Sequence, residues 1–402
     1  MKRALIIGGS MGGLFAALML RKIGWQVDVF ERAASRLVSR GAGIATHPEL
    51  LDALREAGTR VDGSLGVKVR NRVMLAPDGA VMAEITVPQL VTSWSHLYDV
   101  LLEALPARHY HQHRTLVRLE QTGDAVKARF ADGAEETGDL LIGADGIYST
   151  VRAITMADIQ PSYAGYIAWR GLVGERELSP ESHRAIAEKF AFCMPPRQQI
   201  LGYPVPGPDN NVAPGNRSYN FVWYRPADDP PGPDPSELAD LLTDRNGCRH
   251  GLSIAPDQIR PEVIARMRDD GSRVLAPPFA ELVRLAPMPF IQTLCDMESP
   301  RMTAGRVALI GDAPFVARPH PGLGVTKAAL DAVALARALQ KFGDQITDAL
   351  EEFSAQRRIA GAAIVARGRY LGELIRTVPA TEAERRRIAD EILIGTATSS
   401  WN

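Results

Sequence analysis

A glycine-rich turn near the start of the chain restricts the available folds more than any other feature. Residues 4–7 are apolar, as in a buried parallel strand, and residues 14–23 have the pattern of a helix. The turn Gly8-Gly9-Ser10-Met11-Gly12-Gly13 joins them, and residues 27–31 follow as a second strand. This strand–helix–strand unit has the length of about thirty residues that a parallel βαβ motif needs. It predicts a parallel sheet that binds a nucleotide at its carboxyl edge.

The turn has a physical reason for each of its small residues. Gly8 allows a tight bend, and Gly13 lets the helix pack close to the strand, while the helix start offers free N–H groups to a pyrophosphate. Ser10 replaces the usual middle glycine but is small enough for close approach of the backbone. Glu31 ends the second strand, where a carboxylate accepts hydrogen bonds from both ribose hydroxyls. If this motif is considered alone, the alternative to a nucleotide site is a glycine-rich turn that only packs a helix on a strand, with Glu31 as a surface residue.

A second motif, about three hundred residues later, indicates a longer ligand than a simple nucleotide. Residues 307–310 are an apolar strand, and Asp312 follows at its carboxyl edge, where ligands bind in open α/β sheets. Its carboxylate is placed to hold ribityl hydroxyls. The run Pro319-His320-Pro321-Gly322-Leu323-Gly324 then brings bare backbone against a flat ring, before a helix at 326–340. We therefore expect the late loop to hold the flavin end of the same cofactor.

A third motif lies between these two. In residues 142–152 a strand ends, Asp145-Gly146 makes a turn, and a short helix begins with Ser149 as its N-cap. Alone, this segment is an ordinary strand-to-helix turn. Placed between the other two motifs, it is expected to serve both a flavin and a second nucleotide.

Composition excludes several other classes of protein. The formal net charge is −1 and no block of Lys or Arg is present, so a nucleic-acid partner is not expected. Cys193, Cys248 and Cys295 are too few and too widely spaced for a metal site or a disulfide framework, and we expect a cytoplasmic protein without a metal. The apolar N-terminus resembles a signal peptide but is interrupted by the glycines, and no other stretch is long enough to span a membrane.

Together the motifs resemble the single-component, FAD-dependent aromatic hydroxylases over nearly the whole chain, with Glu31-Arg32 and Arg40-Gly41-Ala42-Gly43-Ile44 as further matching pieces. Within that family, residues 164–171, 203–207 and 220–224 are most similar to the 2,6-dihydroxypyridine 3-hydroxylases. The resemblance implies an FAD monooxygenase that uses NAD(P)H and O₂. It hydroxylates a small, electron-rich aromatic or N-heteroaromatic ring through a flavin C4a-hydroperoxide.

The resemblance also implies a domain organisation. We expect an α/β fold, α+β overall, with a Rossmann-like FAD-binding domain, an inserted lobe built on a mainly antiparallel sheet, and a long C-terminal helix at 345–376. The expected discontinuous FAD-binding domain comprises residues 1–66, 91–160 and 278–345. The substrate-binding lobe comprises 67–90 and 161–277, and the C-terminal helical segment comprises 346–402. That helix either covers the first domain or pairs with a second copy of the chain as a homodimer.

The cofactor contacts follow the three motifs and the Arg40–Ile44 segment. The first turn and Glu31 are expected to hold the ADP half of FAD, Asp312 the ribityl and pyrophosphate groups, and the glycine loops the isoalloxazine. The predicted cofactor-binding residues are Gly8, Gly9, Ser10, Met11, Gly13, Glu31, Arg32, Arg40, Ala42, Gly43, Asp145, Gly146, Asp312, Pro319, Gly322, Leu323, Gly324 and Val325.

The substrate pocket is expected between the flavin loop and the sheet of the second lobe. Because alternate residues of a strand share a face, Leu201 lies with Tyr203, and Phe221 lies with Trp223. Tyr203 is the candidate for contacting a ring hydroxyl. The predicted substrate-binding residues are Gln199, Leu201, Phe221, Trp223 and Arg170; the predicted catalytic residues are Tyr203 and the two proton-transfer candidates His47 and His320. Arg170 pairs either with an anionic substrate or with a neighbouring carboxylate.

Other functions remain open on the sequence alone. An NAD-linked dehydrogenase would use the first turn but leave Gly311-Asp312 unexplained. A flavin-dependent halogenase would carry a Trp-x-Trp signature, which is absent. A flavoprotein oxidoreductase or a ligand-binding flavoprotein without ring hydroxylation is the remaining alternative. The identity of the ring and the choice between NADH and NADPH are not fixed by the residues.

Overall fold

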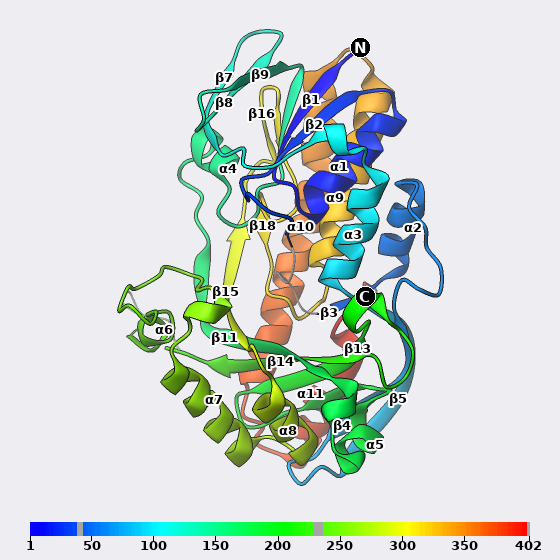
Figure 1. Ribbon diagram of the computed structural model, residues 1–402, viewed down its shortest axis with the longest axis vertical. Helices are drawn as coiled ribbons and strands as arrows, with labels where there is room; N and C mark the ends of the chain where they lie inside the picture. The colour runs from blue at the N-terminus through cyan, green and yellow to red at the C-terminus, as the bar shows by residue number, and fades with distance from the viewer. Residues whose placement is uncertain (38–42, 229–235, 400–402) are drawn as a thin grey trace.

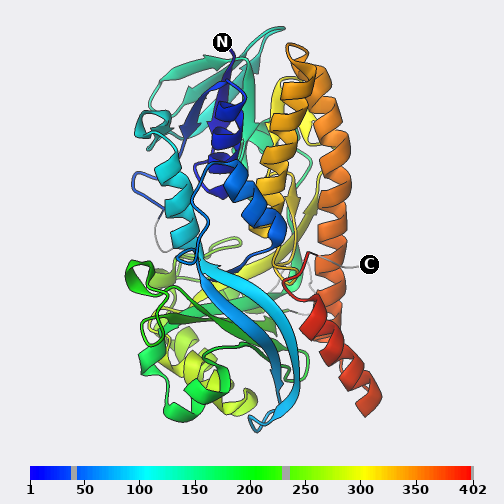
Figure 2. The same cartoon turned by 90° about the vertical axis from the view of Figure 1, so that its right-hand side faces the viewer.

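Two large sheets organise two lobes of the molecule (Figure 1). The computed structural model describes residues 1–37, 43–228 and 236–399. The parallel sheet lies in the upper half of Figure 1 and the mainly antiparallel sheet in the lower half, while helix α10 (Ile346–Arg376) runs beside both (Figure 2). The predicted α/β class, the antiparallel second sheet and the long C-terminal helix are confirmed.

The first sheet forms from short apolar segments that lie far apart in the sequence. Strand β1 (Arg3–Ile7) lies inside it and pairs in parallel with β2 (Gln26–Phe30) and β10 (Leu140–Gly143), and β17 (Val307–Leu309) pairs with β10. These strands are buried along almost their whole length, which explains their near-continuous apolar sequences. The order is β16-β17-β10-β1-β2-β6, with β16 (Thr303–Ala304) and β6 (Tyr110–His111) at the edges.

Helices cover one face of this sheet, and a small antiparallel sheet covers the other. Helix α1 (Met11–Lys22) shares a core with α9 (Gly324–Phe342), with α3 (Trp94–Ala104) and with Ile6 of β1. On the opposite face, apolar side chains of the small sheet pack on Leu5 and Ile7. The small sheet consists of β7 (Leu116–Gln121), β8 (Val126–Phe130) and β9 (Glu135–Gly138).

The second sheet has nine strands, most of them antiparallel. Its strands, in spatial order, are β18 (Phe315–Val316), β15 (Phe290–Glu298), β11 (Ser162–Gly174), β14 (Ser218–Pro226), β13 (Gln199–Val205), β12 (Phe190–Cys193), β4 (Val67–Leu75), β5 (Val81–Ser93) and β3 (Gly43–Ala45). Strands β3, β15 and β18 lie outside the ranges expected for the substrate-binding lobe. The sheet therefore joins segments from both lobes, and the domain boundaries stay a prediction.

The two faces of this sheet have different neighbours. One face packs on α7 (Pro261–Val274) and α8 (Pro277–Leu285). The other face packs in part on the C-terminal end of α10 and on α11 (Glu382–Gly395). The remaining α-helices are α2 (Pro48–Glu56), α4 (Thr150–Thr155), α5 (Pro180–Ile186) and α6 (Ser236–Leu241). Within the described ranges, none of the helices is both long and apolar enough to cross a bilayer.

Candidate active site

Loops from the carboxyl edge of the parallel sheet and one face of the second sheet enclose an elongated cavity of about 590 Å³. Gly8, Glu31 and Arg32 line its first end, and Tyr203 and Tyr224 line its second-lobe side. Asp145 and Asp312 line it as well. The three sequence motifs therefore meet in one cavity, and an aromatic strand face completes it.

The first glycine turn has the geometry that a pyrophosphate site needs. Gly8 has a φ of 105°, which side chains rarely adopt, and a Cβ on Gly13 would overlap the carbonyl oxygen of Gly8. The side chain of Ser10 does not cap α1, so N–H groups of the first helical turn are left for a ligand. The Glu31 carboxylate is buried and accepts a hydrogen bond from the Gly9 N–H at 2.9 Å.

Buried charged side chains, which the sequence did not lead us to predict as part of the site, hold the Gly311–Asp312 loop in place. The Asp331 carboxylate accepts a hydrogen bond from the Gly311 N–H at 3.0 Å and pairs with Arg357 at 2.7 Å. Lys327 lies 3.3 Å from Asp312 and also donates to two loop carbonyls. About half of the Asp312 side chain stays exposed. Its carboxylate is therefore oriented but open to a ligand.

The Asp145 carboxylate is used mainly by its own loop. It accepts hydrogen bonds from the Ser149 hydroxyl at 2.5 Å and from the N–H groups of Thr150 and Val151 at 2.7 and 3.1 Å. Ser149 caps α4 as predicted, by accepting from the Arg152 N–H. Gly146 lines the cavity with a φ of 77°. Asp145 thus shapes the loop, and Gly146 presents its backbone to the cavity.

Two glycine-bearing segments flank the middle of the cavity. The Gly43 N–H donates to the Asn220 side chain at 2.9 Å, and a Cβ on Gly43 would overlap the ring of Tyr203. Gly322 has a φ of 68°. Pro319, Gly322, Leu323, Gly324 and Val325 all line the cavity, whereas Arg40 and Ala42 lie outside the described residues.

These features fit FAD. The uncapped start of α1 suits the pyrophosphate, and the carboxylates of Glu31 and Asp312 suit sugar and ribityl hydroxyls. The backbone at Gly43 and Gly322 lines the cavity, where a flat ring can contact it. The two ends are joined by one continuous cavity.

The face of the second sheet that points into the cavity is set by strand register. Leu201 and Tyr203 of β13 lie opposite Val222 and Asn220 of β14, and Leu201, Tyr203 and Val222 line the cavity. The hydroxyl of Tyr203 has no hydrogen-bond partner within the described ranges. Burial raises the pKa of Tyr203 to about 12, although Arg170 acts in the opposite direction. This phenol is therefore a neutral donor at ordinary pH.

Phe221 and Trp223 require a correction. They share a face, as expected, but it is the opposite face, where both are buried in the core formed with α7 and α8. Residues facing each other across β13 and β14 point the same way, and these two pair with Gly202 and Ile200 rather than with the cavity-lining residues.

Gln199 lies on the cavity-facing side of β13 but does not reach the cavity, and both amide atoms are buried without a partner among the described residues.

Arg170 is a cavity-lining cation whose charge is not neutralised locally. Its guanidinium donates to the Gln292 side chain at 2.9 Å and to the Gly43 carbonyl at 3.5 Å. Within residues 43–228 and 236–399 no carboxylate pairs with it, and its Nε is buried without a partner. The sequence left two partners open for Arg170, an anionic substrate or a neighbouring carboxylate. The described residues show no such carboxylate.

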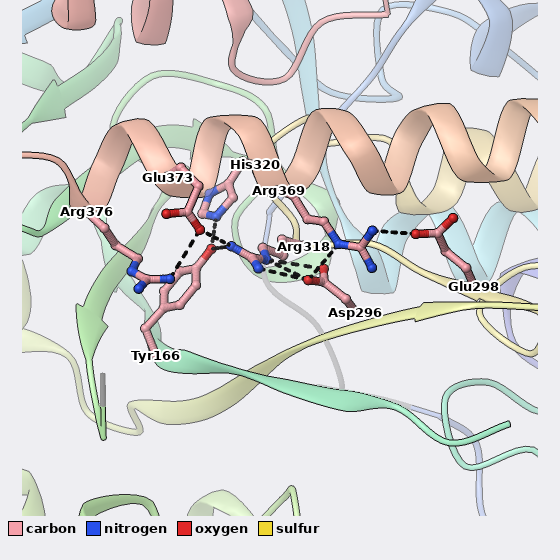
Figure 3. A network of polar contacts seen from close by, with 8 residues as sticks. All are labelled: Tyr166, Asp296, Glu298, Arg318, His320, Arg369, Glu373 and Arg376. Atoms are coloured by element: carbon pink, nitrogen blue, oxygen red, sulfur yellow. Dashed lines mark hydrogen bonds and ion pairs between the residues drawn. The ribbon is translucent and has the colours of Figure 1, made fainter. Parts of the chain in front are cut away.

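His320 belongs to a polar network between residues 319–325, which we call the ring loop, and α10 (Figure 3). Its Nε2 lies 2.6 Å from the Tyr166 hydroxyl, which in turn accepts from Arg318 at 3.5 Å. The Nδ1 of His320 is buried without a hydrogen-bond partner among the described residues. Burial, with the nearby Arg318 cation, lowers the pKa of His320 to about 3. Arg318 itself pairs with the buried Asp296 at 2.8 Å.

His47 does not line the cavity, so its predicted contact with the reacting groups is corrected. It is buried, and its Nδ1 lies 2.9 Å from the Thr326 hydroxyl. Burial lowers the pKa of His47 to about 4, so it is neutral near pH 7. Thr326 lies at the start of α9, which follows the ring loop. His47 therefore supports the helix rather than contacting a ligand.

Several cavity residues were missed because nothing local in the sequence marks them. Gln292 comes from β15, which pairs with β11 and brings the amide beside Arg170. Thr396 and Ala397 follow α11 and line the cavity from the far end of the chain. The missed cavity-lining residues include Phe190, Gln292, Lys327, Thr396 and Ala397.

Comparison with known proteins gives consistent matches. A family model described as FAD binding domain-like matches residues 163–296. The chain is 35% identical to the 2,6-dihydroxypyridine 3-monooxygenase of Paenarthrobacter nicotinovorans over 342 residues, which cover 85% of this chain and 84% of that protein. It is 29% identical to the 3-amino-4-hydroxybenzoate 2-monooxygenase of Streptomyces cremeus, with 92% and 87% covered. The solved structure of 2,6-dihydroxypyridine-3-hydroxylase from Arthrobacter nicotinovorans superposes with a TM-score of 0.86 at 32% identity, covering 95% of each chain.

Proposed function

The chain belongs to the FAD-dependent aromatic monooxygenases, which hydroxylate aromatic or heteroaromatic rings, and we propose that its own substrate is a hydroxylated pyridine bound at Tyr203 and Arg170. FAD is its cofactor, and use of NAD(P)H is typical of the family. The similarity to a 2,6-dihydroxypyridine 3-monooxygenase over most of both chains supports a pyridine ring. The polar groups on the cavity face support a hydroxylated, ionisable one.

Residues from the first lobe hold FAD in this proposal. The backbone of Gly8–Gly13 binds the pyrophosphate, with Glu31 on the adenosine ribose and Asp312 on the ribityl chain. The segments at Gly43 and at 319–325 flank the isoalloxazine. When bound, FAD would accept reducing equivalents from NAD(P)H and activate O₂, the two tasks that ring hydroxylation requires.

Residues of the second lobe orient and activate the ring. Arg170 stabilises the anion of the ring hydroxyl, because an unpaired cation nearby lowers the pKa of an acidic group. The Tyr203 hydroxyl, which stays protonated, donates to a ring oxygen. Leu201, Val222 and Phe190 supply apolar walls that exclude water. The proposal rests on two groups that share one face of the second sheet: among the described residues, the Arg170 guanidinium pairs with no carboxylate and the Tyr203 hydroxyl has no hydrogen-bond partner.

Changing Tyr203→Phe is expected to lower kcat/KM for the hydroxypyridine by about tenfold, because one hydrogen bond worth about 1–1.5 kcal/mol is lost. The ring contacts with Gly43 and Phe190 remain, so FAD affinity is expected to be unchanged. Steady-state kinetics and an FAD titration check both parts. An unchanged kcat/KM would remove Tyr203 from the substrate site.

The substrate proposal is tested by incubating the purified flavoprotein with NADH or NADPH and ¹⁸O₂ in the presence of hydroxypyridines, hydroxynicotinates or hydroxybenzoates. We expect a hydroxypyridine to stimulate reductant oxidation and to gain one labelled oxygen atom, as seen by mass spectrometry. Reductant oxidation that yields hydrogen peroxide alone with every ring would favour a flavoprotein without ring hydroxylation. Labelling confined to hydroxybenzoates would overturn the pyridine assignment but not the family.

A further inference from the structure

The last described segment of the chain, residues 396–399, follows α11 (Figure 2), and its first two residues, Thr396 and Ala397, line the cavity. We propose that this segment is a wall of the redox cavity and that Arg72 is the positioning residue that holds it there. The inference rests on the FAD site proposed above. It assigns a task to a buried arginine on β4 that the ring chemistry itself does not use.

The segment contacts the ring loop directly. The Ala397 N–H donates to the carbonyl of His320 at 3.0 Å. A Cβ on Gly322 would lie 2.9 Å from the Cα of Ala397, so the segment packs closely on Gly322. Ala397 has a φ of 51°, which alanine rarely adopts, so the conformation is imposed by surrounding contacts.

Arg72 supplies part of those contacts. Its Nη1 donates to the carbonyls of Leu393 and Thr396 at 2.7 and 2.6 Å, and its Nη2 donates to the Gln89 side chain at 2.9 Å. Gln89 in turn donates to the carbonyl of Ala397 at 2.9 Å. The guanidinium thus binds the carbonyl end of α11, where the helix dipole favours a cation.

The burial of Arg72 argues for a specific role. It is 1% exposed, and burial lowers its pKa to about 10, which still leaves it charged near pH 7. No carboxylate pairs with it in the ranges that the structure describes. Burying a cation without a counter-ion costs free energy, and the hydrogen bonds that Arg72 donates to the carbonyls of Leu393 and Thr396 offset part of that cost.

Two observations connect this anchor to the cavity. The guanidinium lies over the ring of Phe190, whose centroid is 4.5 Å from that of the Tyr203 ring, so Arg72 supports the aromatic wall. The Thr396 hydroxyl is buried without a partner among the described residues, although Thr396 lines the cavity and is 2% exposed.

The test compares Arg72→Met and Arg72→Lys with Arg217→Met as a matched control. Arg217 is also buried in the second lobe, but it pairs with Glu175 and does not line the cavity. The readouts are iodide quenching of bound flavin, FAD affinity, thermal unfolding, and hydroxylated product formed per NAD(P)H oxidised.

For Arg72→Met we expect at least about a twofold rise in the iodide quenching constant and about a fivefold fall in product per NAD(P)H, because an opened wall admits water. Arg72→Lys is expected to restore part of both values, whereas Arg217→Met lowers the unfolding temperature and leaves both unchanged. If Arg72→Met does not fold, Gln89→Leu, which removes one bond to Ala397, is expected to raise quenching in the same direction.

Quenching and coupling equal to wild type in both Arg72→Met and Gln89→Leu, or equal changes in Arg217→Met, would overturn the inference. Iodide quenching needs bound FAD but no substrate. It therefore decides this inference even if no hydroxypyridine is oxygenated, an outcome that would count against the substrate assignment alone.

Discussion

Replacing Gly13→Ala is expected to give a folded but colourless protein that no longer retains FAD. The added Cβ would overlap the Gly8 carbonyl oxygen, so the turn that presents N–H groups to the pyrophosphate must shift. Losing two hydrogen bonds to a charged group, each worth about 1.5–3 kcal/mol, weakens binding by at least about 100-fold. Absorbance of the purified protein and titration of the apoprotein with FAD measure the loss.

The adjacent residue provides a matched control for this prediction. A Cβ on Gly12 would lie 3.7 Å from the Cβ of Ala328, which is ordinary packing distance. We therefore expect Gly12→Ala to keep its FAD and its yellow colour. Circular dichroism of both variants separates loss of cofactor from loss of fold. A Gly13→Ala protein with wild-type FAD affinity would show that this turn does not bind the pyrophosphate.

Replacing Arg170→Met is expected to lower kcat/KM for an ionisable hydroxypyridine by about 100-fold, equivalent to about 2.7 kcal/mol. The methionine keeps apolar bulk but removes the cation that stabilises the ring anion, and hydrogen bonds to charged groups are worth about 1.5–3 kcal/mol. Because the bound ring then has to lose its proton without this cation, we also expect the pH at which kcat rises to move upward. Kinetics as a function of pH measure both effects.

Arg225→Met is the matched control for this second prediction. Arg225 also lies on the second sheet, but it pairs with Asp270 at 2.9 Å and lies over Trp223, outside the cavity lining. Its loss is expected to leave kcat/KM unchanged, while Arg170→Lys retains part of the activity. A pH profile for Arg170→Met that coincides with that of wild type would rule out its role in stabilising the anion.

The parts of the fold that local sterics determine could be predicted from sequence. The turn at Gly8–Gly13 needs a positive φ and a close backbone approach, and both requirements select glycine in the sequence itself. The apolar strands of the parallel sheet are equally visible, because burial on both faces demands continuous apolar residues. The face-sharing pairs Leu201 with Tyr203 and Phe221 with Trp223 also follow from strand geometry.

The rest depends on contacts between distant segments. Which strand face lines the cavity is decided by the helices α7 and α8, which cover Phe221 and Trp223. The surroundings of Arg170 depend on β15, more than a hundred residues away, and its pairing with Gln292 leaves no mark in the local sequence. The wall at 396–399 likewise requires α11 to end beside Arg72.

The proposed site brings an FAD ring and the substrate together in one cavity, against the face of the second sheet that carries Tyr203 and Arg170. A crystal structure of the protein with FAD and 2,6-dihydroxypyridine, prepared without oxygen, tests this most directly. We predict an isoalloxazine between Gly43 and residues 319–325, with a pyridine oxygen within hydrogen-bonding distance of both the Tyr203 hydroxyl and the Arg170 guanidinium. A pyridine bound away from this strand face, or an isoalloxazine outside the two loops, would contradict the account.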